Sequence, residues 1–310
     1  MSSQFNAKIL NPSDETFNEL KTGNYPWWDN LKKNENISIQ IRKDNTIDVY
    51  YNGGAILSNL KYDKKIKEFT ASIHSKFIPL KKETGKNPNQ LLSLSSNGVS
   101  FSKEIETMEF LQFEKKELTK IINRINQYND AKSEKGIQFK FIANDPFIID
   151  AEFQFGNTLR FDLVRLDKKE KKIVFIEVKT MGDPRLFVEK KNKKEKKAAS
   201  EDINSQLKNY YDFAEANTDS IRDYYKKVLL IKNDLKLTKP EVKGLSLDEW
   251  DVELKPLLVF GDCEKEWIKT NSDKIYQKIK DVAYGTYYFA KPEYSLDLIP
   301  TSNHNRHVYK

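Results

Sequence analysis

Three runs of strand-forming residues follow one another in the middle of the chain, and no other feature constrains the fold as strongly. They are residues 148–155, 159–166 and 173–179, separated by short polar segments. Alternating runs rich in Phe, Ile and Val, bounded by Gly, Asn, Asp and Lys, are typical of antiparallel strands. Gly156 and Asn157 suit a two-residue hairpin loop, because Gly at the first loop position favours a type II′ turn. We therefore predict a three-stranded antiparallel sheet.

The third run is apolar on both faces but ends in charged residues. Glu177 and Lys179 flank Val178, so their side chains point to the same side of the strand, one pleat apart. Charges in a buried strand are costly unless they are paired or bind a metal ion. Asp162, on the second run, would face them from the neighbouring strand. Two carboxylates and an ammonium group suit a Mg²⁺-dependent phosphodiesterase, because Mg²⁺ prefers oxygen ligands and the ammonium can orient the attacking water.

A simpler explanation is a strand whose polar end reaches solvent. The chain has 53 Lys and Arg and 46 Asp and Glu residues, so the spacing Glu-x-Lys often arises by chance. The metal site is favoured by a combination: an acid on one strand, a hairpin, and an apolar run that leads directly into Glu177 and Lys179. On the sequence alone, both explanations remain open.

Scarce cysteine and histidine exclude several kinds of site. The 310 residues include one cysteine, Cys263, and three histidines, His74, His304 and His307. A disulfide framework, a Cys-ligated iron–sulfur cluster or a multi-Cys zinc site needs more cysteines. A His-rich metal site or a Ser-His-Asp triad is disfavoured for the same reason. The chain also lacks the phosphate-binding pattern G-x-x-x-x-G-K-[ST], which argues against an ATP-driven motor.

The charge of the chain favours a polyanionic partner. Its net charge is +7, which suits double- or single-stranded DNA, although excess lysine is also often only solvated surface. No run of about 18 apolar residues indicates a membrane-spanning helix. The first residues lack the charged-then-apolar pattern of a signal peptide. We expect a cytoplasmic protein that does not bind membranes.

The N-terminal part is predicted to be a small β-rich α+β domain. Four strands of an antiparallel meander are predicted at residues 37–42, 46–51, 55–62 and 69–73. A short helix is predicted at residues 14–20. We expect Trp27 and Trp28 to pack under the sheet, although exposed tryptophans would instead stack on bases.

A polar segment at residues 83–100 predicts a linker, since it is rich in Gly, Pro, Asn and Ser. The predicted domains are therefore residues 1–95, an accessory domain, and residues 96–310, a catalytic domain. We expect the accessory domain to bind a partner protein or a second copy of the chain.

Helical and apolar patterns complete the second domain. Apolar residues at helical spacing predict helices at residues 102–129, 200–217 and 266–282. Further strands are predicted at residues 228–231, 256–260 and, at an edge, 287–289. On the first helix, Glu117 is the candidate for an additional metal or water ligand. The lysine-rich residues 189–197 predict either a solvated loop or a basic flap that contacts DNA phosphates.

The order helix, three antiparallel strands with D…E-x-K, helix, strand resembles the core of the PD-(D/E)xK nuclease superfamily. Asp162 and Glu177-Val178-Lys179 carry this motif. On the following helix, Gln206 and Tyr210 match the Q-x-x-x-Y motif of the RecB-like branch, which is also seen in lambda-exonuclease-like enzymes. The resemblance covers about residues 102–233.

The resemblance implies an α/β fold with a mixed sheet and a restriction-endonuclease-like core. It implies a metal-dependent DNA nuclease, of exonuclease type, in phage defence, restriction or DNA repair. Asp162, Glu177 and the backbone carbonyl of Val178 would bind Mg²⁺ or Mn²⁺, and Lys179 would position or help deprotonate a water. Gln206 and Tyr210 would orient the site or contact the substrate. The candidates for contact with DNA phosphates are Arg160, Lys190, Lys191 and Lys208.

Two other hypotheses come from different classes of protein. One is a catalytically inactive nucleic-acid-binding or regulatory protein on the same fold. The other is a basic α+β interaction protein in which the Glu-x-Lys spacing is a coincidence.

Overall fold

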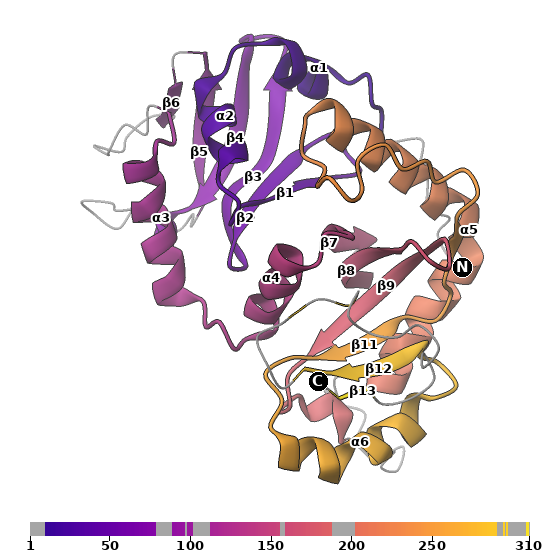
Figure 1. The fold of residues 1–310 in the computed structure, drawn as a ribbon. Coiled ribbons are helices and arrows are strands. Elements are labelled where there is room, and N and C mark those ends of the chain that lie inside the picture. Colours follow the sequence, from indigo (N-terminus) through magenta and orange to yellow (C-terminus); the bar gives the residue numbers. More distant parts are fainter. Residues whose placement is uncertain are drawn as a thin grey trace, which may run out of the picture. The chain divides into compact units, whose positions relative to one another are not determined.

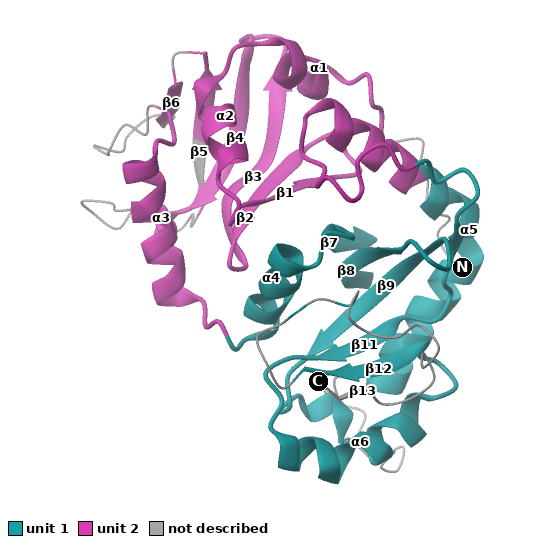
Figure 2. Ribbon diagram, viewed as in Figure 1, with its two compact units in different colours: residues 1–6, 132–223, 246–310 teal, residues 7–131, 224–245 magenta. Residues whose placement is uncertain are grey.

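The computed structural model describes residues 10–78, 89–96, 98–101, 112–155, 159–187, 202–289, 294, 296 and 308–309. Within this part of the chain the fold is mixed α/β, with six α-helices and two sheets. The chain divides into two compact units (Figure 2). Unit 1 comprises residues 1–6, 132–223 and 246–310, and unit 2 comprises residues 7–131 and 224–245.

Unit 2 is built on a six-stranded antiparallel sheet in simple chain order (Figure 1). Its strands are β1 (Ser38–Ile41), β2 (Ile47–Tyr51), β3 (Gly54–Asp63), β4 (Glu68–His74), β5 (Asn89–Ser95) and β6 (Gly98–Phe101). The first four confirm the predicted meander. The last two correct the predicted linker at residues 83–100. Leu92 and Leu94 are buried between serines, and this period-2 alternation is a strand signal that the polar composition concealed.

Three short helices accompany this sheet: α1 (Glu15–Thr22), α2 (Pro26–Lys33) and α3 (Lys115–Tyr128). Trp27 and Trp28 lie on α2 and are 0% and 1% exposed, so they belong to the core and are not available to stack on bases. The predicted helix at residues 102–129 is described only from Lys115 onward, because residues 102–111 lie outside the described part.

Unit 2 does not end at residue 95. The end of the long helix α5 (Ile203–Asp234) packs on its first strand: the Tyr224 hydroxyl donates to the Ile41 carbonyl at 3.3 Å, and Lys232 Nζ donates to Gln40 Oε1 at 3.1 Å. Residues 228–231 are therefore helical, which corrects the predicted strand. Of these four, only Leu230 is exposed, as expected for an apolar helix with one outward position.

Unit 1 contains a mixed sheet in the order β13-β12-β11-β9-β8-β7 (Figure 1). Its strands are β7 (Ile148–Phe155), β8 (Leu159–Asp167), β9 (Lys172–Lys179), β10 (Asp251–Val252), β11 (Leu257–Phe260), β12 (Gly285–Tyr288) and β13 (Val308–Tyr309). The first three are antiparallel, as predicted. β11 runs parallel to β9, and β12 parallel to β11. The strand predicted at an edge is β12, but it pairs with both β11 and β13 and is therefore not an edge strand. The predicted hairpin residues Gly156 and Asn157 lie outside the described residues.

Helices α4 (Glu134–Asn144) and α5 cover opposite faces of this sheet. Ile137 and Phe141 of α4 share a core with Ile176 and Val178 of β9. Phe175 precedes Ile176 on β9 and therefore points to the other face, where it stacks on Phe161, which contacts Tyr210 and Phe213 of α5. A third helix, α6 (Lys265–Ile279), was predicted and lies on the α5 side of the sheet. The ring centroids of Trp267 and Phe260 are 5.7 Å apart, and the side-chain amide of Asn204 on α5 donates to the Lys278 carbonyl.

The alternation of β8 breaks at Asp162. Leu163 lies in the α4 core, whereas Phe161 packs against α5, although residues two apart on a regular strand share one face. The same change occurs on β7, where Ala151 lies in the α4 core and Phe153 packs with Phe161 and Phe213. Glu152, between Ala151 and Phe153, has a left-handed backbone conformation (φ 56°). The strand predicted at residues 159–166 is therefore present, but a regular alternation would place Phe161 and Leu163 on one face, and the structure places them on opposite faces.

Candidate metal-binding site in unit 1

Glu177 and Lys179 form a buried ion pair at the end of β9. Their side chains are 2% and 1% exposed, and Lys179 Nζ contacts Glu177 Oε1. The ammonium also donates to the carbonyl of Val178 at 3.2 Å. A polar strand end in solvent would leave these groups exposed, so the simpler explanation of the Glu-x-Lys spacing is excluded.

Asp162 joins this pair from β8. It is buried, and its Oδ2 accepts a hydrogen bond of 2.8 Å from the backbone N–H of Val178, in the middle of the Glu-x-Lys segment. Burial, followed by the negative charge of Glu177, holds the pKa of Asp162 well above its usual range; the charge of Lys179 and the Val178 hydrogen bond act in the opposite direction. Two neighbouring buried carboxylates repel one another, and a bound cation relieves that repulsion.

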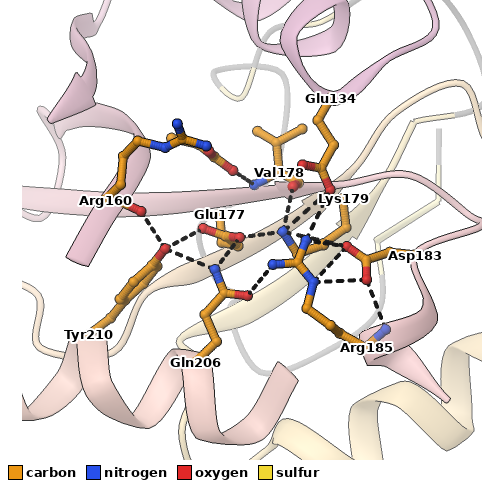
Figure 3. Close-up of polar contacts among 10 residues, drawn as sticks. Glu134, Arg160, Glu177, Val178, Lys179, Asp183, Arg185, Gln206 and Tyr210 are labelled. Atoms are coloured by element: carbon orange, nitrogen blue, oxygen red, sulfur yellow. Dashed lines mark hydrogen bonds and ion pairs between the residues drawn. The ribbon is translucent and has the colours of Figure 1, made fainter. Parts of the chain in front are cut away.

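Gln206 and Tyr210 approach Glu177 from α5, one helical turn apart (Figure 3). Gln206 Nε2 donates to Glu177 Oε1 at 2.6 Å and to the Tyr210 hydroxyl at 3.0 Å. The Tyr210 hydroxyl lies 2.8 Å from Glu177 Oε2 and also contacts the carbonyl of Arg160, so its single proton serves one acceptor at a time. Burial and the charge of Glu177 raise the pKa of Tyr210, which keeps the hydroxyl protonated.

Lys179 remains a cation in this surrounding. Burial lowers its pKa, but the charges of Glu177, Asp162 and Glu134 outweigh burial, so the pKa lies above its ordinary value. The ammonium is thus a hydrogen-bond donor with three protons and no lone pair. Of the two roles expected for Lys179, orienting a water fits this state better than removing a proton from one.

The structure adds three residues that sequence reasoning missed. Glu134 is the first residue of α4, and its Oε1 lies 3.4 Å from both Lys179 Nζ and Arg185 Nη2. Asp183 is buried with an oxygen 3.7 Å from Lys179 Nζ, and it pairs with Arg185 (Figure 3). Ser133, which caps α4 by accepting from the Gly136 N–H, was the signal for this helix. Asp183 directly precedes Pro184 in a tight turn, where no periodic pattern marks it.

Glu117, the candidate for an additional metal or water ligand, has a structural partner within its own helix turn. It lies on α3 in unit 2, where its carboxylate accepts from the backbone N–H of Glu114 at 2.9 Å and completes a capping box. Within unit 1, Glu134 is an acid from the helix that precedes β7, and its Oε1 lies near Lys179 Nζ.

The candidate DNA contacts are partly described. The Arg160 side chain is 54% exposed and forms an ion pair of 3.2 Å with Glu152. Lys208 is exposed on α5, where its ammonium pairs with Asp212 at 2.9 Å. Lys190 and Lys191 lie outside the described residues.

The donor set fits a small divalent cation. Within the described ranges, no group of three or more His, Cys, Asp or Glu side chains is arranged to hold a metal ion. Asp162, Glu177 and the Val178 carbonyl nevertheless supply oxygen donors from adjacent strands, and Mg²⁺ commonly uses one or two carboxylates and retains several waters. Four acids (Glu134, Asp162, Glu177 and Asp183) also face only two bases, Lys179 and Arg185. A divalent cation would balance that excess.

No family model, curated protein or solved structure matches this chain. Among the described residues, none of the helices has both the length and the apolar character that crossing a lipid bilayer requires.

Proposed function

We propose that unit 1 is a metal-dependent deoxyribonuclease that hydrolyses phosphodiester bonds in DNA. The observation that carries the proposal is the convergence of three separate sequence segments. Asp162 of β8, Glu177 and Lys179 of β9, and Gln206 and Tyr210 of α5 join through hydrogen bonds in one buried cluster. A chance Glu-x-Lys spacing gives no reason for these five residues to meet.

The arrangement of elements also supports the proposal. Helix α4, strands β7 to β9, the first part of α5 and strand β11 follow in the order of a PD-(D/E)xK core, with β11 parallel to β9. We propose a restriction-endonuclease-like core on this basis. In this core, α4 takes the place of the long helix predicted at residues 102–129, and β11 that of the strand predicted at residues 228–231.

Each side chain has a role in this chemistry. Asp162, Glu177 and the Val178 carbonyl would hold Mg²⁺ or Mn²⁺. When bound, the metal ion supplies a Lewis acid that offsets negative charge on the reacting phosphoryl group. Gln206 and Tyr210 keep Glu177 in one orientation through both of its oxygens. Lys179 donates hydrogen bonds and thereby orients a water or a phosphate oxygen.

The substrate would be held mainly through its phosphates. Arg160 and Lys208 are exposed cations on the elements that carry the cluster: the Arg160 carbonyl contacts Tyr210, and Lys208 lies on α5 between Gln206 and Tyr210 in sequence. The Q-x-x-x-Y resemblance favours the exonuclease type, and a role in phage defence, restriction or DNA repair.

The test is cleavage of linear, circular and single-stranded DNA by the purified chain in Mg²⁺, in Mn²⁺ and in EDTA. We expect metal-dependent loss of linear DNA, and loss of activity in Asp162→Asn and Glu177→Gln. Glu215→Gln is the control, because Glu215 is an exposed acid on α5 in the same unit and accepts a hydrogen bond from Tyr211. Cleavage by Glu177→Gln at the wild-type rate would refute the site. Binding of DNA without any cleavage would favour the nucleic-acid-binding alternative.

A further inference from the structure

Arg185 is an arginine at the candidate site that the proposed chemistry does not use. It lies in a one-turn 3₁₀ helix (Pro184–Leu186) directly after β9, and its backbone N–H donates to Asp183 Oδ1 at 2.8 Å. Its side chain is 27% exposed, and its guanidinium lies between Asp183, Glu134 and Gln206 (Figure 3). This arginine is therefore held at the site and does not extend into solvent.

The contact with Gln206 determines how its amide is oriented. Arg185 Nη1 donates to Gln206 Oε1 at 3.1 Å, while Gln206 Nε2 donates to Glu177 Oε1 at 2.6 Å. A guanidinium has only donors and a carboxylate only acceptors, so an amide between them has one favourable orientation. The reversed amide would direct its oxygen at Glu177 and its NH₂ group at Arg185, and both contacts would be lost.

The contact with Asp183 affects Lys179. Asp183 is a buried carboxylate 3.7 Å from Lys179 Nζ, and it competes with Glu177 for that ammonium. Arg185 Nε donates to both oxygens of Asp183, at 2.9 and 3.1 Å, and Nη2 donates to Oδ2. Burial raises the pKa of Asp183, but its hydrogen bonds from Arg185 outweigh burial and lower the pKa. Because Arg185 balances the negative charge of Asp183, the Lys179 ammonium keeps its contacts with Glu177 and the Val178 carbonyl.

We propose that Arg185 is a positioning residue for the metal site: it fixes the Gln206 amide and neutralises Asp183, so that Glu177 and Lys179 keep their places. This proposal rests on the proposed nuclease function. Arg185 acts through residues that surround the expected metal ligands, and removal of such a supporting contact typically lowers metal affinity or activity 10- to 100-fold.

The test compares Arg185→Gln and Arg185→Lys with Arg222→Gln in the full-length chain. Arg222 is a matched control, because it lies in the same unit, is 29% exposed and pairs with an aspartate three residues away. Two readouts are needed: the affinity for Mn²⁺ by calorimetry without DNA, and the Mn²⁺ concentration for half-maximal cleavage. We expect Arg185→Gln to weaken both about 10-fold or more. Arg185→Lys keeps the charge but loses the planar set of N–H donors, so its Mn²⁺ affinity should lie between those of wild type and Arg185→Gln. Arg222→Gln should match wild type.

A double variant separates positioning from general stability. If Arg185 acts on Glu177 through Gln206, then Arg185→Gln combined with Gln206→Ala should bind Mn²⁺ little worse than Gln206→Ala alone. Additive losses, or wild-type values for Arg185→Gln, would overturn the role of Arg185 while leaving the nuclease proposal intact. A wild-type chain that neither binds Mn²⁺ nor cleaves DNA would overturn both. Thermal melting shows whether Arg185→Gln is folded; if it is not, Arg185→Lys decides between these outcomes.

Discussion

The side-chain amide of Gln206 donates a hydrogen bond of 2.6 Å to Oε1 of Glu177, a residue 29 positions earlier in the chain. This bond joins α5 to the end of β9. Because Tyr210 binds the other oxygen of the same carboxylate, α5 satisfies a buried charge that the sheet alone would leave exposed to repulsion from Asp162.

Removing the Tyr210 hydroxyl should destabilise the chain. In Tyr210→Phe, Oε2 of the buried Glu177 loses its donor, and a lost hydrogen bond to a charged group costs about 1–3 kcal/mol. The free energy of unfolding in urea should fall by that amount. The control is Tyr211→Phe. The Tyr211 hydroxyl donates to the exposed Glu215, so its removal should leave the free energy of unfolding unchanged within error. Equal losses in the two variants would show that Tyr210 does not stabilise Glu177.

Removing the Lys179 ammonium should make stability depend on metal. Lys179→Met leaves Glu177 buried without its cation, and breaking a buried ion pair costs about 3–5 kcal/mol. We expect a lower melting temperature in EDTA, and partial recovery in Mn²⁺, because a bound cation replaces the lost charge. Lys208→Met, which breaks an exposed pair with Asp212, should melt as wild type does in both buffers. A Lys179→Met chain that melts like wild type in EDTA contradicts the burial of this pair.

Glycine should be better than alanine at position 152. Glu152 has φ 56°, and a left-handed backbone costs a residue with a Cβ about 1 kcal/mol. Both substitutions remove the ion pair with Arg160, so their difference isolates the backbone. We expect the free energy of unfolding of Glu152→Gly to be about 1 kcal/mol larger than that of Glu152→Ala. At Gln154, exposed on the same strand, glycine should be the worse of the two by a similar amount. The same order at both positions would contradict the left-handed conformation.

A methyl group at position 261 should disturb the placement of α4. A Cβ on Gly261 would lie 2.5 Å from Cγ2 of Ile137, a fully buried residue of α4. Overpacking of this kind costs about 1–3 kcal/mol. Gly182→Ala is the control, since no atom lies within 4 Å of its Cβ position. We expect Gly261→Ala to lower the melting temperature and Gly182→Ala to leave it unchanged. Stability equal to wild type in Gly261→Ala would mean that Ile137 does not pack there.

Local patterns identified most of the strands that carry the candidate site. The run that forms β7 alternates, the run that forms β9 is continuously apolar, and Glu177 and Lys179 stand out because these charges end that apolar run. Gln206 and Tyr210 were singled out by the resemblance to the Q-x-x-x-Y motif, whose spacing places both side chains on one face of a helix. Periodicity therefore located the side chains that sit on regular elements.

The remaining features depend on tertiary contacts that periodicity does not report. Residues 228–231 form an apolar run of four, which fits a buried strand and a helix equally well until the neighbouring sheet is known. Glu134, Asp183 and Arg185 lie at a helix start and in a tight turn, where no repeat marks them. The break in alternation at Asp162 coincides with the left-handed backbone of Glu152, which lies opposite it on β7, and the sequence pattern does not report backbone conformation.

Neither compact unit is a continuous stretch of chain, and this affects the order in which the protein can fold during synthesis. The sheet of unit 2 emerges from the ribosome long before residues 224–245, which complete it. The sheet of unit 1 gains β11 and β12 only after that segment has been made. A nascent chain that stops at residue 223 therefore holds two unfinished cores with exposed apolar surface, the condition in which newly made proteins engage chaperones. We expect resistance to protease to appear late in translation, and in both units within a short interval.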